Sequence, residues 1–328
     1  MSTEYDVLVL GGAGVDTIVY VPELPLPYAD SHMIRPGITA RAGQTGDFVT
    51  LGLASLGLRT HHIDLIGDDH EGELVRAFHH ARSLPFTGVP QPLGTKRAVN
   101  LVGPDARRLS LYDDSRAAES DRLPEATVRE LAAKSRHAHV SITHPCAYTL
   151  PLLREAGLTL STDLHDWDGV NPYHEPFAFE ADLVFLSATA LEDPGATLRR
   201  IAQHGRARVA VATDGAAGAH LLVDGELTHL PAIAPPEPVV DSNGAGDAFA
   251  AGFLLGWLAG EEAARCALFG AVAGAYACTV EATRADAIGR EQLLARVAEW
   301  EAGAGTVAAP TADAVAAPTR ARGVAETL

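Results

Sequence analysis

One short segment combines two acids with small residues in a spacing that could do chemistry. From Asp241 to Phe249 the chain reads Asp-Ser-Asn-Gly-Ala-Gly-Asp-Ala-Phe, between the end of an apolar strand pattern and a long apolar helical pattern. Small residues in a turn that opens a helix let backbone amides approach an anion, where the helix dipole favours negative charge. The segment therefore predicts a phosphate-binding turn. Its amides belong to Gly244, Ala245 and Gly246.

Asp247 falls in the first turn of the predicted helix, so its carboxylate can face the same anion. A carboxylate in this place suits a general base that takes the proton of an attacking hydroxyl while the amides hold a transferring phosphoryl group. The structural alternative is an aspartate that caps a helix after a glycine turn, which is common. The preceding Asp241 and the strand–turn–helix context favour the catalytic interpretation.

The elements that must position this turn alternate along the chain. Strands are predicted at residues 6–10, 60–66, 139–143, 158–163, 182–186 and 208–212. Helices are predicted at residues 46–56, 71–82, 125–135, 150–156 and 196–204. Alternation of this kind predicts βαβ units and a mostly parallel sheet with helices on both faces. Such sheets bind their ligands beyond the carboxyl ends of the strands.

Two segments, at about residues 17–41 and 96–114, interrupt the alternation. The first is rich in Pro and Gly, and the second reads as two alternating strands around Gly103-Pro104-Asp105. Both look too exposed for the central sheet, so we expect them to form a small β-sheet lid. A hairpin is predicted at residues 219–230, and apolar helices at 249–258 and 263–278. Residues 1–302 are expected to form one domain, and the Ala/Pro-rich residues 303–328 a disordered tail.

Composition narrows the classes of partner. The 328 residues carry a formal net charge of −17 without a basic run, so nucleic acid and anionic membranes are not expected partners. No targeting segment or membrane span is evident. Three widely spaced cysteines predict reduced thiols in a cytoplasmic protein, not a disulfide framework or a zinc site. The 14 histidines show no metal-ligand spacing on one surface and are interpreted as surface or core residues.

The segment from Asp241 to Asp247 resembles the Asp-Thr-x-Gly-Ala-Gly-Asp signature of the ribokinase-like (PfkB) family of carbohydrate kinases, and the resemblance runs from Val7 to about Ile288. It implies an α/β fold, a Rossmann-type αβα sandwich with a small β-sheet lid. It also implies ATP with Mg²⁺ as co-substrate, and it leaves room for a monovalent cation. Under this resemblance Asp247 is the general base, and residues 244–246 form the anion hole.

Further segments resemble the family in the same order. Residues 12–16, Gly-Ala-Gly-Val-Asp, resemble its first-strand exit, which makes Asp16 a contact of acceptor hydroxyls. The same glycines imitate a dinucleotide fingerprint, but they lead into Pro22 and Pro25 instead of a helix, which disfavours a dehydrogenase. Residues 213–218 resemble a Thr-x-Gly-x-x-Gly turn that lies against the nucleotide. The nucleotide contacts so implied are Thr213, Gly215, Gly218 and Asn243.

The chain departs from the family where a glycine pair and an Asn should open the first helix. Gln44 takes the place of the second glycine after Gly43, and Phe48 takes the place of the acceptor-binding Asn. Asp47 could replace that Asn only if the helix start is shifted by one residue. Gly43, Asp47 and Phe48 are therefore the candidate acceptor contacts on this helix. An aromatic wall at Phe48 suits the apolar face of a sugar or a stacked base, which predicts an uncharged acceptor.

A second departure concerns the metal. The family's Asn-x-x-Glu motif is replaced by Ser-Ala-Thr-Ala at residues 187–190, with Glu192 two residues late, so the metal ligands stay unknown. The acidic segment 163–168 either borders an ATP–metal site or is a solvated loop. A degenerate, non-catalytic sugar- or nucleotide-binding protein of the same fold remains the alternative function.

The residues and the resemblance together predict an ATP-dependent kinase that transfers the γ-phosphoryl group to a hydroxyl of a small sugar, polyol or nucleoside. A small sheet of this kind also presents a face for dimerisation. A homodimer through the lid is therefore expected.

Overall fold

The computed structural model describes residues 3–35 and 37–303. Its largest element is a nine-stranded sheet in the order β13-β12-β11-β10-β9-β8-β1-β4-β5. The strands from β11 to β5 are parallel, and β12 and β13 add an antiparallel edge. The bounds are β1 Tyr5–Leu10, β4 Thr60–Ile66, β5 Phe86–Pro90, β8 Ser135–Val140, β9 Thr159–Asp163, β10 Leu183–Ser187, β11 Val209–Thr213, β12 Ala219–Val223 and β13 Glu226–Leu230.

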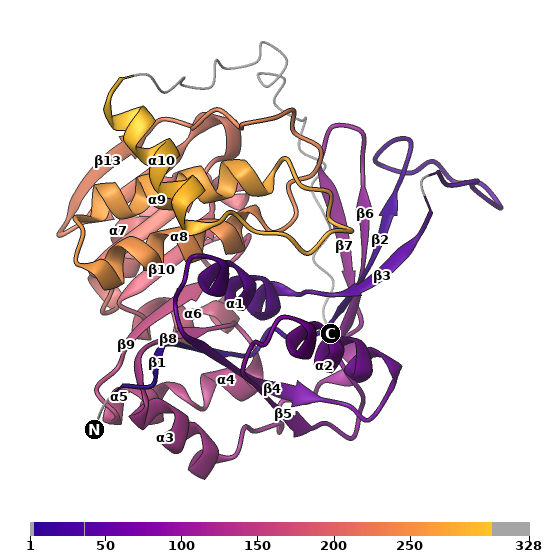
Figure 1. Cartoon of the computed structure of the whole chain (residues 1–328), viewed down its shortest axis with the longest axis horizontal. Coiled ribbons are helices and arrows are strands. Elements are labelled where there is room, and N and C mark those ends of the chain that lie inside the picture. Colours follow the sequence, from indigo (N-terminus) through magenta and orange to yellow (C-terminus); the bar gives the residue numbers. More distant parts are fainter. Residues whose placement is uncertain (1–2, 36, 304–328) are drawn as a thin grey trace.

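Helices cover both faces of this sheet (Figure 1). Successive side chains of a strand point to opposite faces, so Leu8 and Leu10 of β1 enter one core while Val7 and Val9 enter the other. The first core contains side chains of α3 (Glu125–Ala133), α5 (Leu150–Glu155), α6 (Glu175–Glu180) and α7 (Pro194–His204). The second contains side chains of α1 (Thr45–Ser55), α8 (Ala245–Ala259), α9 (Ala263–Ala277) and α10 (Arg290–Glu301).

The helices α8 and α9 pack very closely because glycines lie at their contact. A Cβ atom on Gly252 would lie 2.6 Å from the carbonyl oxygen of Phe269. This close approach explains why both helices are rich in Ala and Gly and why α8 is buried on most sides. The start of α8, where the phosphate-binding turn was predicted, is thereby held firmly against the sheet.

A second, four-stranded sheet has the order β3-β2-β6-β7 and stands beside the large one (Figure 1). Its strands are β2 Val15–Tyr20, β3 Thr39–Ala42, β6 Arg97–Val102 and β7 Arg108–Tyr112. Asp16 pairs with Arg41 and Ala98, and Ala98 pairs with Tyr112. Paired residues share a face, so these four side chains lie on the same face of the small sheet. Asp16 and Ala98 are buried, and this face therefore looks toward the large sheet.

The predicted strands and helices match the structure to within a few residues except around β8. The prediction for 139–143 is wrong, because β8 begins at Ser135 and ends at Val140. Two buried histidines of β8 hid the strand pattern: His137 Nε2 and His139 Nδ1 lie 2.7 and 2.8 Å from the hydroxyl of Ser161. The same shift ends α3 at Ala133, before the predicted residue 135.

Several elements were not predicted at all. They include β5, α6, α10 and the short helices α4 (His144–Ala147) and η3 (Ala188–Ala190); α2 (His70–Ala81) was predicted to within one residue. Residues 304–328 of the predicted tail lie outside the described residues. Within the described part of the chain, no helix has both the length and the apolar character that crossing a membrane requires.

Candidate active site

The predicted phosphate-binding turn lies directly before α8. Gly244 precedes the helix with φ +78° and ψ 0°, a left-handed conformation that favours glycine, and the amides of the next residues open the helix. Asp241 shapes the turn from inside the protein. Its fully buried carboxylate accepts hydrogen bonds from the amide of Asn243 (2.8 Å), the hydroxyl of Tyr20 (2.9 Å) and the amide of Ala282 (3.1 Å). Asp241 is therefore positioned to brace the turn.

Asp247 lies in the first turn of α8 and is half-buried. The acid whose charge acts most strongly on it is Asp163 at the end of β9, whose Oδ2 would lie 3.3 Å from a Cβ atom on Gly246. Burial and the charge of Asp163 together raise the pKa of Asp247 to about 8, and the charge of Arg108 opposes the shift. A carboxylate with a pKa this close to neutrality can accept a proton from a hydroxyl.

Asp16 lies in β2, on the face of the small sheet that looks toward this turn, and is 6% exposed. Burial raises the pKa of Asp16 to about 6, and the charge of Arg41 opposes that shift. The amide nitrogen of the Gln44 side chain lies 3.5 Å from the Asp16 carboxylate. The structure therefore places a second carboxylate opposite the start of α8, from a different sheet.

Arg41 connects this carboxylate to the rest of the site. Its guanidinium donates hydrogen bonds to the carbonyl oxygens of Ala282 and Gly43, and it lies 4.4 Å above the centre of the Phe48 ring. The same ring lies 3.8 Å from the position that a Cβ atom on Gly244 would occupy. Phe48 thus stands between Arg41 and the phosphate-binding turn, which is consistent with the predicted aromatic wall.

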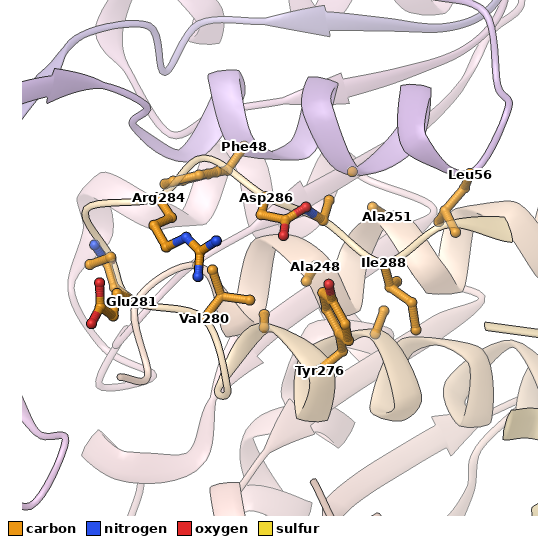
Figure 2. A pocket seen from close by; sticks show the side chains of 17 residues that line it. Phe48, Leu56, Ala248, Ala251, Tyr276, Val280, Glu281, Arg284, Asp286 and Ile288 are labelled. Carbon is orange, nitrogen blue, oxygen red and sulfur yellow. The ribbon is translucent and has the colours of Figure 1, made fainter. Parts of the chain in front are cut away.

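A small cavity of about 30 Å³ opens beside Phe48 and is also lined by Asn243 and Gly244 (Figure 2). Figure 2 places Phe48, from α1, and Tyr276, from α9, on different sides of this cavity. A volume near 30 Å³ holds about one water molecule.

The structure places Asp47 in the protein interior, which removes it from the candidate acceptor contacts. Its side chain is fully buried, and it accepts hydrogen bonds from His79 Nε2 (2.8 Å) and the amide of Gly14 (3.1 Å). The helix begins at Thr45, which puts Asp47 in its first turn, where the carboxylate satisfies backbone donors. These hydrogen bonds explain why residue 47, directly before the position of the family's Asn, is an aspartate.

Asp47 also belongs to a buried group that the sequence did not reveal. Ligand atoms of Asp47, His62 and His79 lie within 4.8 Å of one another, close enough in principle for a metal ion. His62 Nε2 lies 2.9 Å from the carbonyl oxygen of Gly11, and burial lowers the pKa of His62 to about 4. Hydrogen bonds join the three side chains within the core, and His79 Nδ1 has no hydrogen-bond partner among the described residues.

The predicted nucleotide contacts lie at the carboxyl ends of neighbouring strands. Thr213 ends β11 and pairs with Ser187 at the end of β10, beside Asp163 at the end of β9. Gly215 has φ +50° and nothing within 4 Å of an added Cβ atom, so it borders open space. Gly218 differs, because a Cβ atom there would lie 2.1 Å from the carbonyl oxygen of Leu230. A glycine is therefore required at residue 218 because the end of the hairpin β12–β13 packs directly against it.

Asn243 was expected to contact the nucleotide, and an Asn-x-x-Glu motif was expected at residues 187–190. In the structure both places hydrogen-bond to other residues of the protein. The side-chain oxygen of Asn243 accepts a hydrogen bond from Arg108 of the small sheet. Ser187 and Thr189, where Asn-x-x-Glu was expected, hydrogen-bond to each other at 2.7 Å. Sequence reasoning also assigned no role to Tyr20 or Arg41. The available signal for Arg41 was a charged residue in a short segment two residues before Gly43.

Comparisons with known proteins find relatives over most of the chain. Residues 6–288 match the pfkB family carbohydrate kinases. The chain is 60% identical to an acarbose 7(IV)-phosphotransferase of Actinoplanes sp., over 90% of this chain and 99% of that protein. It is 28% identical to an ATP-dependent ribose-1-phosphate kinase of Halopiger xanaduensis, over 89% and 91% of the two chains.

Solved structures are similar over the same length. The microbiome-derived acarbose kinase Mak1 superimposes with a TM-score of 0.84 at 42% identity, covering 90% of this chain and 100% of that one. The ribokinase of Arabidopsis thaliana, solved with ribose and ATP, has a TM-score of 0.73 at 19% identity, covering 90% and 99%. The second likeness concerns the fold alone.

Proposed function

This chain belongs to the pfkB family of carbohydrate kinases and is an ATP-dependent sugar kinase, and we propose that its acceptor is acarbose or a closely related compound. The predictions of a ribokinase-like fold and of a kinase are confirmed, and the non-catalytic alternative is not favoured. The acceptor proposal rests on the 60% identity to the Actinoplanes phosphotransferase along nearly the whole of both chains.

One observation carries the proposed mechanism: a carboxylate with a pKa of about 8 lies in the first turn of a helix that opens with a left-handed glycine. The proton of the acceptor hydroxyl passes to Asp247 as the hydroxyl oxygen bonds to the γ-phosphorus. The bond between that phosphorus and the β–γ bridging oxygen breaks, and ADP leaves. The amides of residues 244–246 hold the charge on the transferring group, and Asp16 accepts a hydrogen bond from a second acceptor hydroxyl.

We place Mg²⁺, which would accompany ATP, next to Asp163. This carboxylate is 7% exposed and faces Gly246 of the phosphate-binding turn. A carboxylate and a bound phosphate would repel each other unless a cation lies between them. Asp163 would hold the ion together with the hydroxyls of Ser187 and Thr189, and the ion would neutralise phosphate charge.

Two aromatic side chains suit an acceptor built of linked sugar-like rings, as acarbose is. Phe48 lies against the phosphate-binding turn, and Tyr112 lies on the same face of the small sheet as Asp16 and is 72% exposed. Aromatic rings offer flat apolar surfaces on which sugar rings stack. We propose that Phe48 contacts the ring that receives the phosphoryl group and that Tyr112 contacts a more distant ring.

The acceptor is tested by incubating the full chain with ATP·Mg²⁺ and a panel of acarbose, ribose, fructose, adenosine, ribose 1-phosphate and fructose 6-phosphate. Mass spectrometry and NMR of the products identify the compound and the hydroxyl that is phosphorylated. We expect acarbose to give the highest kcat/KM. A higher value for a monosaccharide, a nucleoside or a sugar phosphate would overturn the acceptor while leaving the kinase assignment in place.

We further propose that the small sheet is a lid and that its outer face joins two copies of the chain. Register places Val19, Val99, Leu101, Leu109 and Leu111 on the face opposite Asp16. Leu109 and Leu111 are 49% and 55% exposed on this apolar face, and a contiguous exposed apolar patch marks an interaction surface. Light scattering should give the mass of a dimer for the full chain and of a monomer for the Leu109→Glu, Leu111→Glu variant. A monomeric parent protein would contradict the proposal.

The net charge of −17 gives no support to a nucleic-acid or membrane partner, and neither is proposed. Cys146 and Cys266 are free and buried, and we propose a cytoplasmic location, where such thiols stay reduced.

A further inference from the structure

Arg108 is a cation of the small sheet that lies at the phosphate-binding turn. It is the first residue of β7, and its Nη1 donates a hydrogen bond to the side-chain oxygen of Asn243, directly before Gly244. Beside this contact, the hydroxyl of Ser242 donates to the carbonyl oxygen of Ala106 at 2.8 Å. Two independent hydrogen bonds therefore hold the start of β7 against the turn that would bind the γ-phosphate.

Arg108 is the exposed cation among the charged groups that act on Asp247. The groups whose charges act most strongly on Asp247 are the acidic Asp163 and Asp16 and the basic Arg108 and Arg41. Arg41 is buried; its Nε and Nη1 donate to backbone carbonyl oxygens, and its Nη2 has no hydrogen-bond partner among the described residues. Arg108 is exposed, and its hydrogen bond to Asn243 uses one of the five donors of its guanidinium. Its remaining donors can contact a ligand in the same place.

Lysine cannot supply this charge, because both lysines of the chain are engaged elsewhere. Lys96 pairs with Asp64 at 2.8 Å, and Lys134 pairs with Glu130 at 2.8 Å on the surface of α3. The transferring phosphoryl group carries negative charge on its three equatorial oxygens, and a fixed cation there accelerates transfer. With both lysines paired elsewhere, this task falls to an arginine, and Arg108 hydrogen-bonds to the turn itself through Asn243.

We propose that Arg108 is a catalytic residue whose guanidinium contacts the transferring phosphoryl group from the small-sheet side, opposite the amides of the turn. The proposal rests on the kinase site described above and not on the identity of the acceptor. Because Arg108 belongs to the small sheet, the charge reaches the phosphoryl group only while that sheet lies on the turn. Transfer is thereby linked to closure of the sheet over the acceptor, which limits hydrolysis of ATP by water.

The test compares Arg108→Gln with Arg107→Gln. Arg107 is the adjacent arginine, but it is 74% exposed and pairs with Asp105 of its own loop. We expect Arg108→Gln to lower kcat by about 10³-fold, with KM for ATP and acceptor changed by less than about fivefold, because the charge acts in the transition state. Arg107→Gln should keep the parent kcat. An Arg108→Gln enzyme with near-parent kcat would overturn the proposal.

A binding measurement separates this role from a purely structural latch. ADP with aluminium fluoride and Mg²⁺ imitates the transferring phosphoryl group, whereas ADP with Mg²⁺ does not. Arg108→Gln should weaken binding of the fluoride complex by at least about 10²-fold and leave binding of ADP unchanged. Equal loss for both ligands, or no loss for either, would show that Arg108 only holds the sheet on the turn. This measurement stands even if acarbose is not the acceptor.

Discussion

Two aspartates that bracket one short turn have different tasks because their surroundings differ. Asp241 is fully buried, and its oxygens accept hydrogen bonds from two amides and one hydroxyl. Asp247 is half-buried beside Asp163, so burial and a like charge make its carboxylate basic. A carboxylate whose oxygens are satisfied by donors is structural, whereas a carboxylate with a raised pKa is suited to proton transfer.

Removing the basic oxygen of Asp247 should stop proton transfer while leaving the turn in place. Asp247→Asn is expected to lower kcat by about 10²-fold or more, with little change in ATP affinity. In the parent protein a base with a pKa of about 8 must lose its proton, so kcat/KM should rise with pH and level off above about pH 8. The variant should lose this rise. Near-parent turnover by Asp247→Asn would mean that Asp247 only caps α8.

Phe48 should determine which acceptor binds. Phe48→Asn restores the residue type that the family resemblance implies and removes the aromatic wall. We expect KM for the acceptor to rise about tenfold, or preference to shift toward simple sugars, with ATP binding intact. Phe48→Tyr keeps the ring and is the matched control. Unchanged KM and preference in Phe48→Asn would place the acceptor away from α1.

At the scale of elements, the small sheet and the phosphate-binding turn are joined by contacts from separate strands. Tyr20 of β2 donates to Asp241, and Arg41 of β3 donates to the carbonyl oxygen of Ala282. Arg108 of β7 donates to Asn243. A displacement of the sheet would break all of these contacts together. The sheet is therefore coupled to the residues that shape the turn.

This coupling predicts how the sheet responds to ligands. Saturating acceptor together with a non-hydrolysable ATP analogue should slow backbone hydrogen exchange in residues 17–41 and 96–114. Tyr20→Phe removes the hydroxyl that bonds to Asp241 and should reduce this protection, while the exchange of α7, on the far face of the large sheet, stays constant. Identical exchange with and without ligands would rule out a lid.

At the scale of the whole molecule, buried histidines make the fold sensitive to acid. Burial lowers the pKa of His62 to about 4, of His137 to about 3 and of His139 to about 4. In the unfolded chain each would titrate near its ordinary pKa of about 6.5. The unfolded state therefore binds more protons below that pH, and acid favours it.

The free energy of unfolding should be constant with respect to these groups above about pH 6.5 and should fall steadily between about pH 6.5 and 4. Urea unfolding at pH 7.5, 6.0 and 5.0 measures this slope. His137→Gln, which can still hydrogen-bond to Ser161, should have a shallower slope because it has no proton to bind. The exposed His204→Gln should keep the parent slope. Asp16 and Asp247, whose pKa values are raised, oppose this slope equally in the parent and in the variant. Equal slopes in the parent and in His137→Gln would therefore contradict the expectation.

The sequence by itself determined the order of strands and helices, the glycine turn before α8 and the position of Asp247. These features depend on local periodicity and on the backbone freedom of glycine, and both can be recognised in a short stretch of sequence. It failed at β8, where buried polar histidines broke the apolar pattern, and at Asp47, whose carboxylate is used within the core.

Only the tertiary structure decided which residues meet at the turn. Tyr20 and Asp241 are 221 residues apart, and Arg108 and Asn243 are 135 apart, so no local pattern relates them. The basicity of Asp247 is likewise decided there, because it arises from burial and from Asp163 on another strand. Charge and burial act through space, and the fold alone fixes those distances.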